Sequence, residues 1–178
     1  MTARFRTLLL LALGVAAGGV PARAVEDIKP PFGLVWGESA TRIERLLKNV
    51  KAEIKGRRAA SGGLEAWDVE GLAQKGLKRT VFYFRASELV EVELQYQRDD
   101  WDQRQYDEFM GQVRQAIQRR FGEGDLIARK TEPADKDVTQ TIVGYKWNQN
   151  NAAVELFYYS AQNAENVFRT ISVHYKTR

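Results

Sequence analysis

Two glutamates in a predicted strand, Glu91 and Glu93, have the spacing of a catalytic carboxylate pair. Side chains at positions i and i+2 of a strand share one face and stand about 7 Å apart. This separation overlaps that of an inverting glycosidase, in which one carboxylic acid protonates the leaving oxygen and the other carboxylate activates water. Such chemistry also needs burial that raises the pKa of one carboxyl group, whereas the polar side of an amphipathic strand faces water. We therefore interpret both glutamates as solvated, and a carbohydrate-active enzyme that uses them remains the alternative.

The chain has one histidine, His174, which alternates out of phase with Val173 and Tyr175 and so belongs to the polar side of its predicted strand. A histidine-based catalytic site needs a nucleophile and an orienting acid beside the ring. The sequence contains no Gly-x-Ser-x-Gly nucleophile motif and no cysteine. We therefore expect a surface histidine and no enzymatic activity.

Three aspartates surround Trp101, namely Asp99, Asp100 and Asp102. A calcium loop would add a glycine at its sharp turn and a distal bidentate glutamate, and no glycine follows here. Acidic residues at the start of a helix accept hydrogen bonds from its unpaired N–H groups and complement the helix dipole. The cluster predicts a helix cap, and we expect no metal and no cofactor.

Five basic residues are expected at the end of the first predicted helix, where they complement the helix dipole and add solubility. They are Lys48, Lys51, Lys55, Arg57 and Arg58. Weak attraction to an anionic membrane surface is a secondary hypothesis for this basic run.

The first 24 residues have the three regions of a secretory signal peptide. Two arginines, Arg4 and Arg6, precede an apolar run of 13 residues that ends at Val20. The small residues Ala22 and Ala24 then form the cleavage pattern. The apolar run is shorter than the ~20 residues that a membrane-spanning helix needs. We expect cleavage after Ala24 and export to the periplasm, with release outside the cell as the alternative.

The charge of the chain depends on this leading segment. The whole sequence has 27 lysines and arginines against 23 aspartates and glutamates, a net charge of +4. Three of the arginines lie in the predicted signal, so the mature chain has a net charge of only +1. Nucleic-acid binding needs a basic surface that neutralises phosphates, and we do not expect it here. Because the chain has no cysteine, its fold must hold without disulfides, and it lacks the cysteine on which a bacterial lipoprotein is acylated.

Two amphipathic helices and several alternating strands are predicted between residues 25 and 178. Ser39 is the expected N-cap of the first helix, whose apolar stripe consists of Ile43, Leu46, Leu47 and Val50. The second helix runs from about residue 102 to 121, with Gly122 as its C-terminal glycine. Strands with alternating polarity are expected at 65–69, 80–84, 90–97, 141–147, 154–158 and 171–175.

These elements predict one α+β domain, residues 25–178, with an antiparallel sheet and helices packed on one of its faces. The order of a helix followed by strands occurs twice. Residues 81–84 are also similar to residues 156–159. We therefore predict two tandem repeats, at about 37–98 and 102–178.

Hairpin pairing assigns the side chains of the first half to the two sides of the sheet. A loop within residues 85–88 sets Tyr83 opposite Val90 and Val81 opposite Val92. The side chains predicted to face the helices are Val81, Tyr83, Val90, Val92 and Leu94. Those predicted to face outward are Phe82, Phe84, Glu91 and Glu93.

The same reasoning applies to the second half, where a loop at residues 148–151 pairs Trp147 with Ala152 and Tyr145 with Val154. This register directs outward two further aromatic residues, Phe157 and Tyr159, and we expect Phe168 to join them. The residues that it directs inward are Val143, Tyr145, Val154 and Leu156. Large aromatic residues interleaved with polar ones are typical of an interface. The predicted partner-binding residues are Phe82, Phe84, Glu91, Glu93, Phe157, Tyr159 and Phe168. The alternative is that the segment before the first helix, or curvature of the sheet, covers these aromatic rings.

Residues 37–47, Gly-Glu-Ser-Ala-Thr-Arg-Ile-Glu-Arg-Leu-Leu, resemble the Gly-x-Ser/Thr-x-x-x-Val-x-x-Leu-Leu opening of the small outer-membrane-assembly lipoproteins. In that family the opening leads into a helix, and an aromatic strand residue such as Trp67 follows, so this likeness covers about residues 33–70. The tandem arrangement of the whole mature chain resembles the β-lactamase-inhibitor protein family, in which two helix-plus-strands repeats form a sheet with a concave protein-binding face. The lipoproteins carry an acylated cysteine and the inhibitors carry disulfides, and this chain has neither.

Together these patterns predict an exported, non-catalytic binding module. The expected partner is another envelope or extracellular protein, held by the aromatic and polar side chains of the open side of the sheet. Besides the carbohydrate-active enzyme, a carrier of a lipid or small apolar ligand is an alternative, and it predicts an enclosed apolar cavity.

Overall fold

The computed structural model describes residues 26–135 and 137–177, so the signal peptide predicted at residues 1–24 lies outside the described residues. The first half of the chain forms α1 (Ala40–Asn49), β1 (Glu53–Ala60), a short 3₁₀ turn (Ser61–Gly63), β2 (Leu64–Glu70), β3 (Leu77–Arg85) and β4 (Glu88–Tyr96). The second half forms α2 (Gln103–Phe121), β5 (Asp125–Asp135), β6 (Val138–Asn148), β7 (Ala152–Gln162) and β8 (Val167–Thr177).

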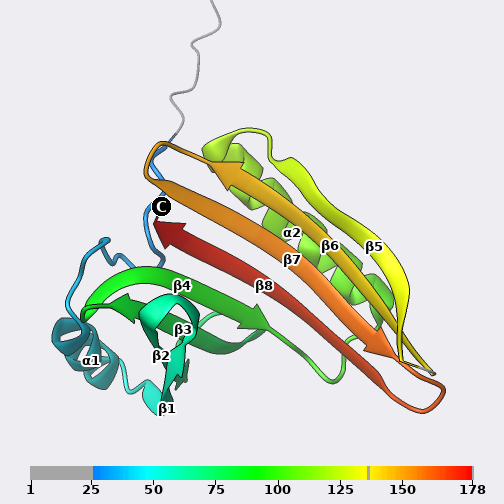
Figure 1. The fold of residues 1–178 in the computed structure, drawn as a ribbon, viewed down its shortest axis with the longest axis horizontal. Helices are drawn as coiled ribbons and strands as arrows, with labels where there is room; N and C mark the ends of the chain where they lie inside the picture. The colour runs from blue at the N-terminus through cyan, green and yellow to red at the C-terminus, as the bar shows by residue number, and fades with distance from the viewer. Residues whose placement is uncertain (1–25, 136, 178) are drawn as a thin grey trace, which may run out of the picture.

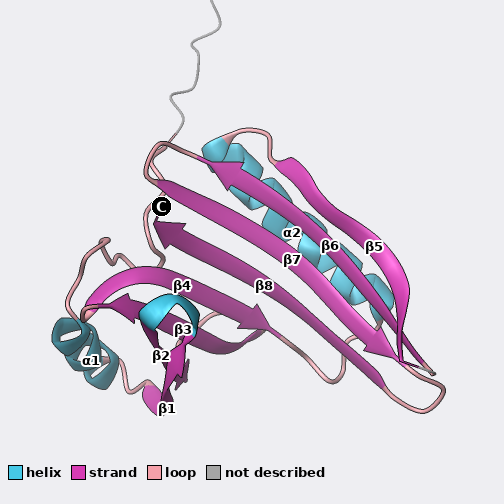
Figure 2. Cartoon of the chain, in the orientation of Figure 1, coloured by secondary structure: helices cyan, strands magenta, loops and turns pink. Residues whose placement is uncertain are grey.

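The eight strands make one antiparallel sheet in the order β1-β2-β3-β4-β8-β7-β6-β5. Helix α2 lies along the long strands β5 to β8, and α1 lies at the other end of the molecule, beside β1 to β4 (Figure 1). Strands dominate the chain (Figure 2). The predicted α+β class with an antiparallel sheet is therefore confirmed.

Both helices begin at the predicted N-cap residues, and α2 ends at the predicted glycine. The Ser39 hydroxyl accepts a hydrogen bond from the Arg42 N–H at 3.4 Å, as an N-cap does. Asp102 accepts from the Gln105 N–H at 2.8 Å, and the Gln105 side chain accepts from the Asp102 N–H at 2.8 Å, which completes a capping box. Gly122 ends α2 with a φ of 84°, a value that favours glycine. The prediction that the aspartate cluster caps a helix is thus confirmed for Asp102.

The two edge strands, β1 and β5, were not predicted. Three residues of the basic run, Lys55, Arg57 and Arg58, lie on β1 and not at the end of the first helix. Arg57 pairs across the gap with Glu44 of α1 at 3.2 Å, and its guanidinium lies 4.1 Å from the Trp67 ring centroid. The helix ends at Asn49, and the strand that follows carries only one large apolar residue, Ile54, which is too little for alternation to reveal it.

The hairpin of β3 and β4 contains a β-bulge that reverses the predicted sides. Its two turn residues, Ala86 and Ser87, have φ values of 49° and 66°, as a tight hairpin turn requires. Phe84 pairs with Leu89 as expected, but Tyr83 pairs with Glu91, so one residue of β4 is left without a partner.

Because of this bulge, the four β3 residues whose sides were predicted all lie on the opposite side of the sheet. Phe82 and Phe84 are each only 1% exposed and belong to the core, so the prediction that they face outward is wrong. Tyr83 and Val81, predicted to face the helices, instead pair with Glu91 and Glu93 on the other side. Because side chains alternate with a period of two residues, a single extra residue exchanges the two sides.

The second predicted register is also shifted, but by two residues. Trp147 pairs with Val154 and Tyr145 pairs with Leu156, where Ala152 and Val154 were expected. A shift of two preserves the side that each residue faces. The inward assignment of Tyr145, Val154 and Leu156 is therefore confirmed, since all three are buried.

One continuous apolar cluster contains residues from both helices and from the sheet. Helix α1 contributes Ile43 and Leu47, and α2 contributes Tyr106, Ile117 and Phe121. The segment before α1 joins this cluster through Ile28, whose carbonyl accepts a hydrogen bond from the Trp36 indole at 3.0 Å.

The two segments that suggested a duplication lie on different sides of the sheet. Val81 faces away from the core cluster, whereas its counterpart Leu156 belongs to it. Conversely, Phe82 is in the core, whereas its counterpart Phe157 is only partly buried. The local similarity of residues 81–84 and 156–159 therefore reflects strand composition and not equivalent positions.

Replacing Phe82 tests the corrected sidedness. Phe82→Ala should lower the free energy of unfolding by about 3–5 kcal/mol, because it empties an enclosed aromatic site. Phe157→Ala makes the same chemical change at a partly exposed ring and should cost clearly less. Urea denaturation of both variants measures the difference. Equal losses would contradict the placement of the two rings on opposite sides of the sheet.

Candidate functional site

One row of side chains crosses all eight strands on the side of the sheet opposite the core cluster. The registers place in this row Gly56, Asp68, Val81, Glu93, His174, Glu155, Lys146 and Asp125. Six of these eight residues are ionisable. We call the side of the sheet that carries this row the polar face.

His174 lies at the middle of the polar face, where β8 pairs with β4. Its Nδ1 atom is 2.8 Å from Glu91 Oε1. Its Nε2 atom is 3.8 Å from Glu93 Oε1 and 3.3 Å from Ser172 Oγ. The ring of Phe157 stands edge-on to the imidazole, with the two centroids 6.0 Å apart. The expected surface histidine is therefore a partly buried member of a hydrogen-bonded cluster.

Glu93 is the most enclosed acid of this cluster. The Tyr83 hydroxyl donates to its Oε2 at 2.8 Å, and the Gln95 side-chain amide donates to its Oε1. The Arg79 guanidinium holds Gln95 in place through hydrogen bonds of 2.7 and 3.0 Å to the amide oxygen. Burial, together with the adjacent Glu93 charge, raises the pKa of Tyr83, so its phenol stays protonated and remains a donor.

The prediction that Glu91 and Glu93 are solvated is wrong. Their side chains are only 20% and 11% exposed, and each carboxylate is in contact with polar groups of the protein. Sequence alternation assigned them to the polar face correctly, but it could not show that the neighbouring strand would cover them. Side chains of β3 and β8 contact the two carboxylates where the prediction assumed water.

Glu155, directly across from His174 on β7, is held by two lysines. The Lys176 ammonium donates to its Oε2 at 2.7 Å, and the Lys146 ammonium lies 2.9 Å from its Oε1. Burial by itself raises the pKa of Glu155, but the hydrogen bonds and charges of the two ammonium groups outweigh it and hold the pKa below the usual value. Glu155, Lys146 and Lys176 thus form an ion triad in which one carboxylate is shared by two ammonium groups.

Asp68, toward the β1 edge of the row, lies between two arginines. Arg58 Nε donates to its Oδ2 at 3.4 Å, and Arg79 Nη1 lies 3.5 Å from its Oδ1. The two arginine side chains are 50% and 40% exposed, so each guanidinium group lies beside the Asp68 carboxylate and is also partly open to solvent.

Three of the five predicted outward aromatics lie on the polar face. Phe157 and Tyr159 on β7 are partly buried, and Phe168 on β8 is 45% exposed. The rings of Tyr159 and Phe168 have centroids 6.2 Å apart, so they form one aromatic patch near the β7–β8 turn. The remaining two, Phe82 and Phe84, are in the core as described above.

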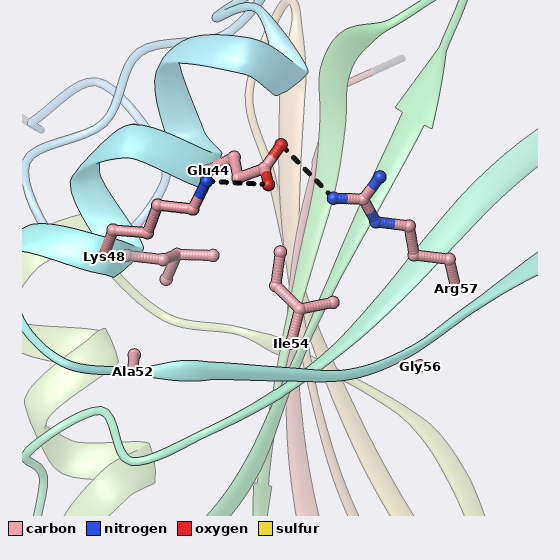
Figure 3. A pocket seen from close by; sticks show the side chains of 7 residues that line it. Glu44, Lys48, Ala52, Ile54, Gly56 and Arg57 are labelled. Carbon is pink, nitrogen blue, oxygen red and sulfur yellow. Dashed lines mark ion pairs between the residues drawn. The ribbon is translucent and has the colours of Figure 1, made fainter.

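A separate hollow of about 400 Å³ lies between α1 and β1. Glu44 reaches from α1 toward both Lys48 and Arg57, at 3.2 Å from each, while Ile54 points from β1 into the space beneath the helix (Figure 3). The charged residues that line this hollow are paired with one another. This arrangement ties the helix to the edge strand and offers no unpaired group for chemistry.

Several residues of the site were not predicted from the sequence, for two reasons. Tyr83 was assigned to the wrong side because of the bulge. Glu155, Lys146 and Lys176 were not singled out, because nothing local in a strand tells which distant strand will lie beside it. The only available signal was that Glu155 alternates with the apolar Val154 and Leu156. No group of three His, Cys, Asp or Glu within residues 26–135 and 137–177 could hold a metal ion.

No protein-family model, curated protein or solved structure matches this chain. Of the helices in the described part of the chain, neither is long and apolar enough to span a membrane. The function must therefore be argued from the site itself.

The lowered pKa of Glu155 predicts how the stability of the fold depends on pH. Its pKa is lowered from an ordinary value of 4.5 in the folded state, so its ion triad stabilises the fold above that pH, and this contribution is lost as the pH falls through the folded-state value. Glu155→Gln should lower the free energy of unfolding by about 1–3 kcal/mol at pH 7. The difference from the unmodified chain should shrink in acid. Urea titrations at several pH values measure this.

Glu108→Gln is the matched control, because this carboxylate is 59% exposed on α2. It should change stability little at any pH, since exposed ion pairs contribute little. A pH-independent loss in Glu155→Gln, or an equal loss in the control, would contradict the role given to the triad.

Proposed function

We propose that this chain is an exported, non-catalytic binding module that holds a protein partner against the polar face of its sheet. The observation that carries the proposal is the combination on one face of a fixed charge pattern with an aromatic patch, Tyr159 and Phe168, beside it. Aromatic residues anchor protein interfaces, and charged groups set orientation and partner choice. Export rests on the signal-like residues 1–24 and places the partner in the periplasm, or outside the cell.

The proposal includes a finer architecture, in which both helices cover the core side and leave the polar face open. Two observations support it. Phe82, Val92 and Tyr175 occur in one cross-strand row on the core side, so the strands of both halves share this side. Ile43 of α1 and Ile117 of α2 belong to the same buried cluster as this row. Each half then consists of one helix followed by four strands, which is the arrangement of two tandem units.

The fixed hydrogen bonds of the polar face favour recognition over catalysis. A general acid or base must exchange a proton with a substrate at hydrogen-bond distance. The Glu93 carboxylate instead accepts from Tyr83 and Gln95, and Glu91 lies against His174. Groups that are pre-positioned and internally paired lose little conformational entropy on binding, which benefits a recognition surface.

The carbohydrate-active alternative has one observation in its favour, namely that Glu91 and Glu93 are partly buried and lie beside His174. It predicts cleavage of cell-envelope glycans that Glu91→Gln abolishes. Contact of the basic run with a membrane surface has less support, because Arg57 and Arg58 are engaged by Glu44 and Asp68.

The proposal is tested by capture of an envelope partner on the immobilised mature chain. Replacing Tyr159 and Phe168 with serine should weaken the interaction at least about 30-fold, because aromatic anchors of this kind contribute about 2 kcal/mol or more. Circular dichroism should show an unchanged fold, because neither side chain is in the core. Binding is measured by surface plasmon resonance once the captured protein is identified.

Ile127→Ser supplies the control, since Ile127 is an apolar residue of similar exposure, 45%, on the edge strand β5. It should leave the affinity unchanged. If the double variant binds as the unmodified chain does, or if the control loses binding equally, the polar face is not the binding surface.

A further inference from the structure

The apolar stripe of α1 is only half covered by the protein. Its spacing predicts burial of four residues, yet only Ile43 and Leu47 are enclosed, while Leu46 and Val50 are 38% and 59% exposed. Apolar side chains exposed in a group, and not singly, mark a surface that meets another apolar body.

The exposed half of the stripe borders a cavity of about 420 Å³. The floor consists of the buried side chains of Ile43, Leu47 and Phe82, and the opposite wall comes from Leu72 and its neighbours in the loop after β2. Small-molecule sites typically have volumes of ~300–1,000 Å³ with mostly apolar walls. The cavity is thus of the right size and lining for the hydrocarbon part of one small ligand.

Phe32 supplies an independent observation at the rim of this cavity. It lines the cavity with 42% of its surface exposed, and its φ is 63°, followed by Gly33 with a φ of 72°. A bulky residue with positive φ is a true outlier, and strain of this kind is retained at ligand sites where the conformation is used. Phe32 and Gly33 form the centre of a turn in which the Leu34 N–H donates to the Pro31 carbonyl at 3.4 Å, and the turn holds the Phe32 ring against the cavity.

Three basic residues adjoin the cavity-lining residues in the sequence. Arg45 precedes the lining residue Asn49 by one turn of α1, Lys51 follows the lining residue Val50, and Lys75 lies two residues beyond Ala73. All three are exposed, and within the described part of the chain none of them forms an ion pair.

The acids near these cations in sequence are already engaged or lie on the other face: Glu44, next to Arg45, pairs with Lys48 and Arg57, and Glu53, two residues after Lys51, pairs with Lys55. Glu70 is the acid nearest to Lys75 in sequence. It alternates with the buried Val69 on β2 and so points to the other side of the sheet. Three unpaired cations beside an apolar cavity match an anionic head group attached to a hydrocarbon chain.

We infer that this cavity binds one anionic single-chain amphiphile, a fatty-acid carboxylate, with its chain between α1 and the loop after β2. The site is distinct from the polar face, on the opposite side of the sheet through Phe82. The hydrocarbon chain of the ligand covers the exposed side chains of Leu46 and Val50. Its carboxylate lies near Arg45, Lys51 and Lys75.

The test is isothermal titration of the mature chain with octanoate, decanoate and dodecanoate below their micelle concentrations. The affinity should rise about fourfold for each added methylene, which is the fold-change expected when a CH₂ group leaves water for an apolar site. Dodecyltrimethylammonium, with the same chain and the opposite charge, should bind more weakly than dodecanoate. Absence of binding, no dependence on chain length, or equal affinity for the cation would each overturn the inference.

Two variants keep the test specific to the cavity. Ala73→Trp places a large ring in the cavity without adding charge, and should weaken dodecanoate binding at least about tenfold. Ile127→Asp alters an exposed apolar residue on β5 and should leave the affinity unchanged. Equal weakening by both variants would mean adsorption to the surface and would overturn the site. Sedimentation of the chain with phosphatidylglycerol vesicles that Ala73→Trp abolishes would overturn the choice of a free fatty acid.

Discussion

The pairing of β4 with β8 is the constraint on which both sides of the sheet depend. Among the described strands, it is the only ladder that joins the first four to the last four. Its core side aligns Val92 and Leu94 with apolar residues of β8, while its other side sets Glu93 against His174. A slip of one residue would expose the valine and bury the glutamate without its donors. The apolar side therefore fixes the register, and the register assembles the polar cluster.

The strands themselves could be predicted from alternation, but their sides could not be predicted equally well in the two halves. In the second half the error was a shift of two residues at the Trp147 hairpin, which changes partners and preserves sides. In the first half one extra residue at the β3–β4 turn moved Phe82 from the predicted surface to the core. A bulge has no clear sequence signal when, as here, its extra residue, Val90, is an ordinary strand former. Alternation therefore assigns side chains to the correct side of a sheet only where the hairpin contains no bulge.

The candidate site shows a second limit of sequence analysis. His174 and Glu91 were each recognised as residues of a polar strand face, but they are 83 positions apart in sequence and meet only through the β4–β8 ladder. A single chain carries no local indication of such a pairing. The burial of Glu93 could not be predicted either, because the side chain that encloses it, Tyr83, was assigned to the opposite side of the sheet. When Tyr83 is assigned to the wrong side of the sheet, Glu93 is wrongly expected to be solvated, because the side chains next to a carboxylate decide how much water reaches it.

The two helices differ in how completely the sheet covers them, and the reason is the way α1 is attached. Its N-terminus is joined to the β3–β4 hairpin, where the Ala40 N–H donates to Ser87 at 2.9 Å and the Leu89 N–H donates to Glu38 at 2.9 Å. These bonds fix one end of a helix of 10 residues above strands that are short and strongly bent. The other end continues through three residues into the edge strand β1, and the Ala52 N–H donates to the Leu47 carbonyl at 3.0 Å. Hollows border the helix on both sides. A short, straight helix joined to the β3–β4 hairpin at one end and to the edge strand β1 at the other cannot follow a curved sheet along its whole length. The incomplete coverage of Leu46 and Val50 is therefore a consequence of how the helix is attached.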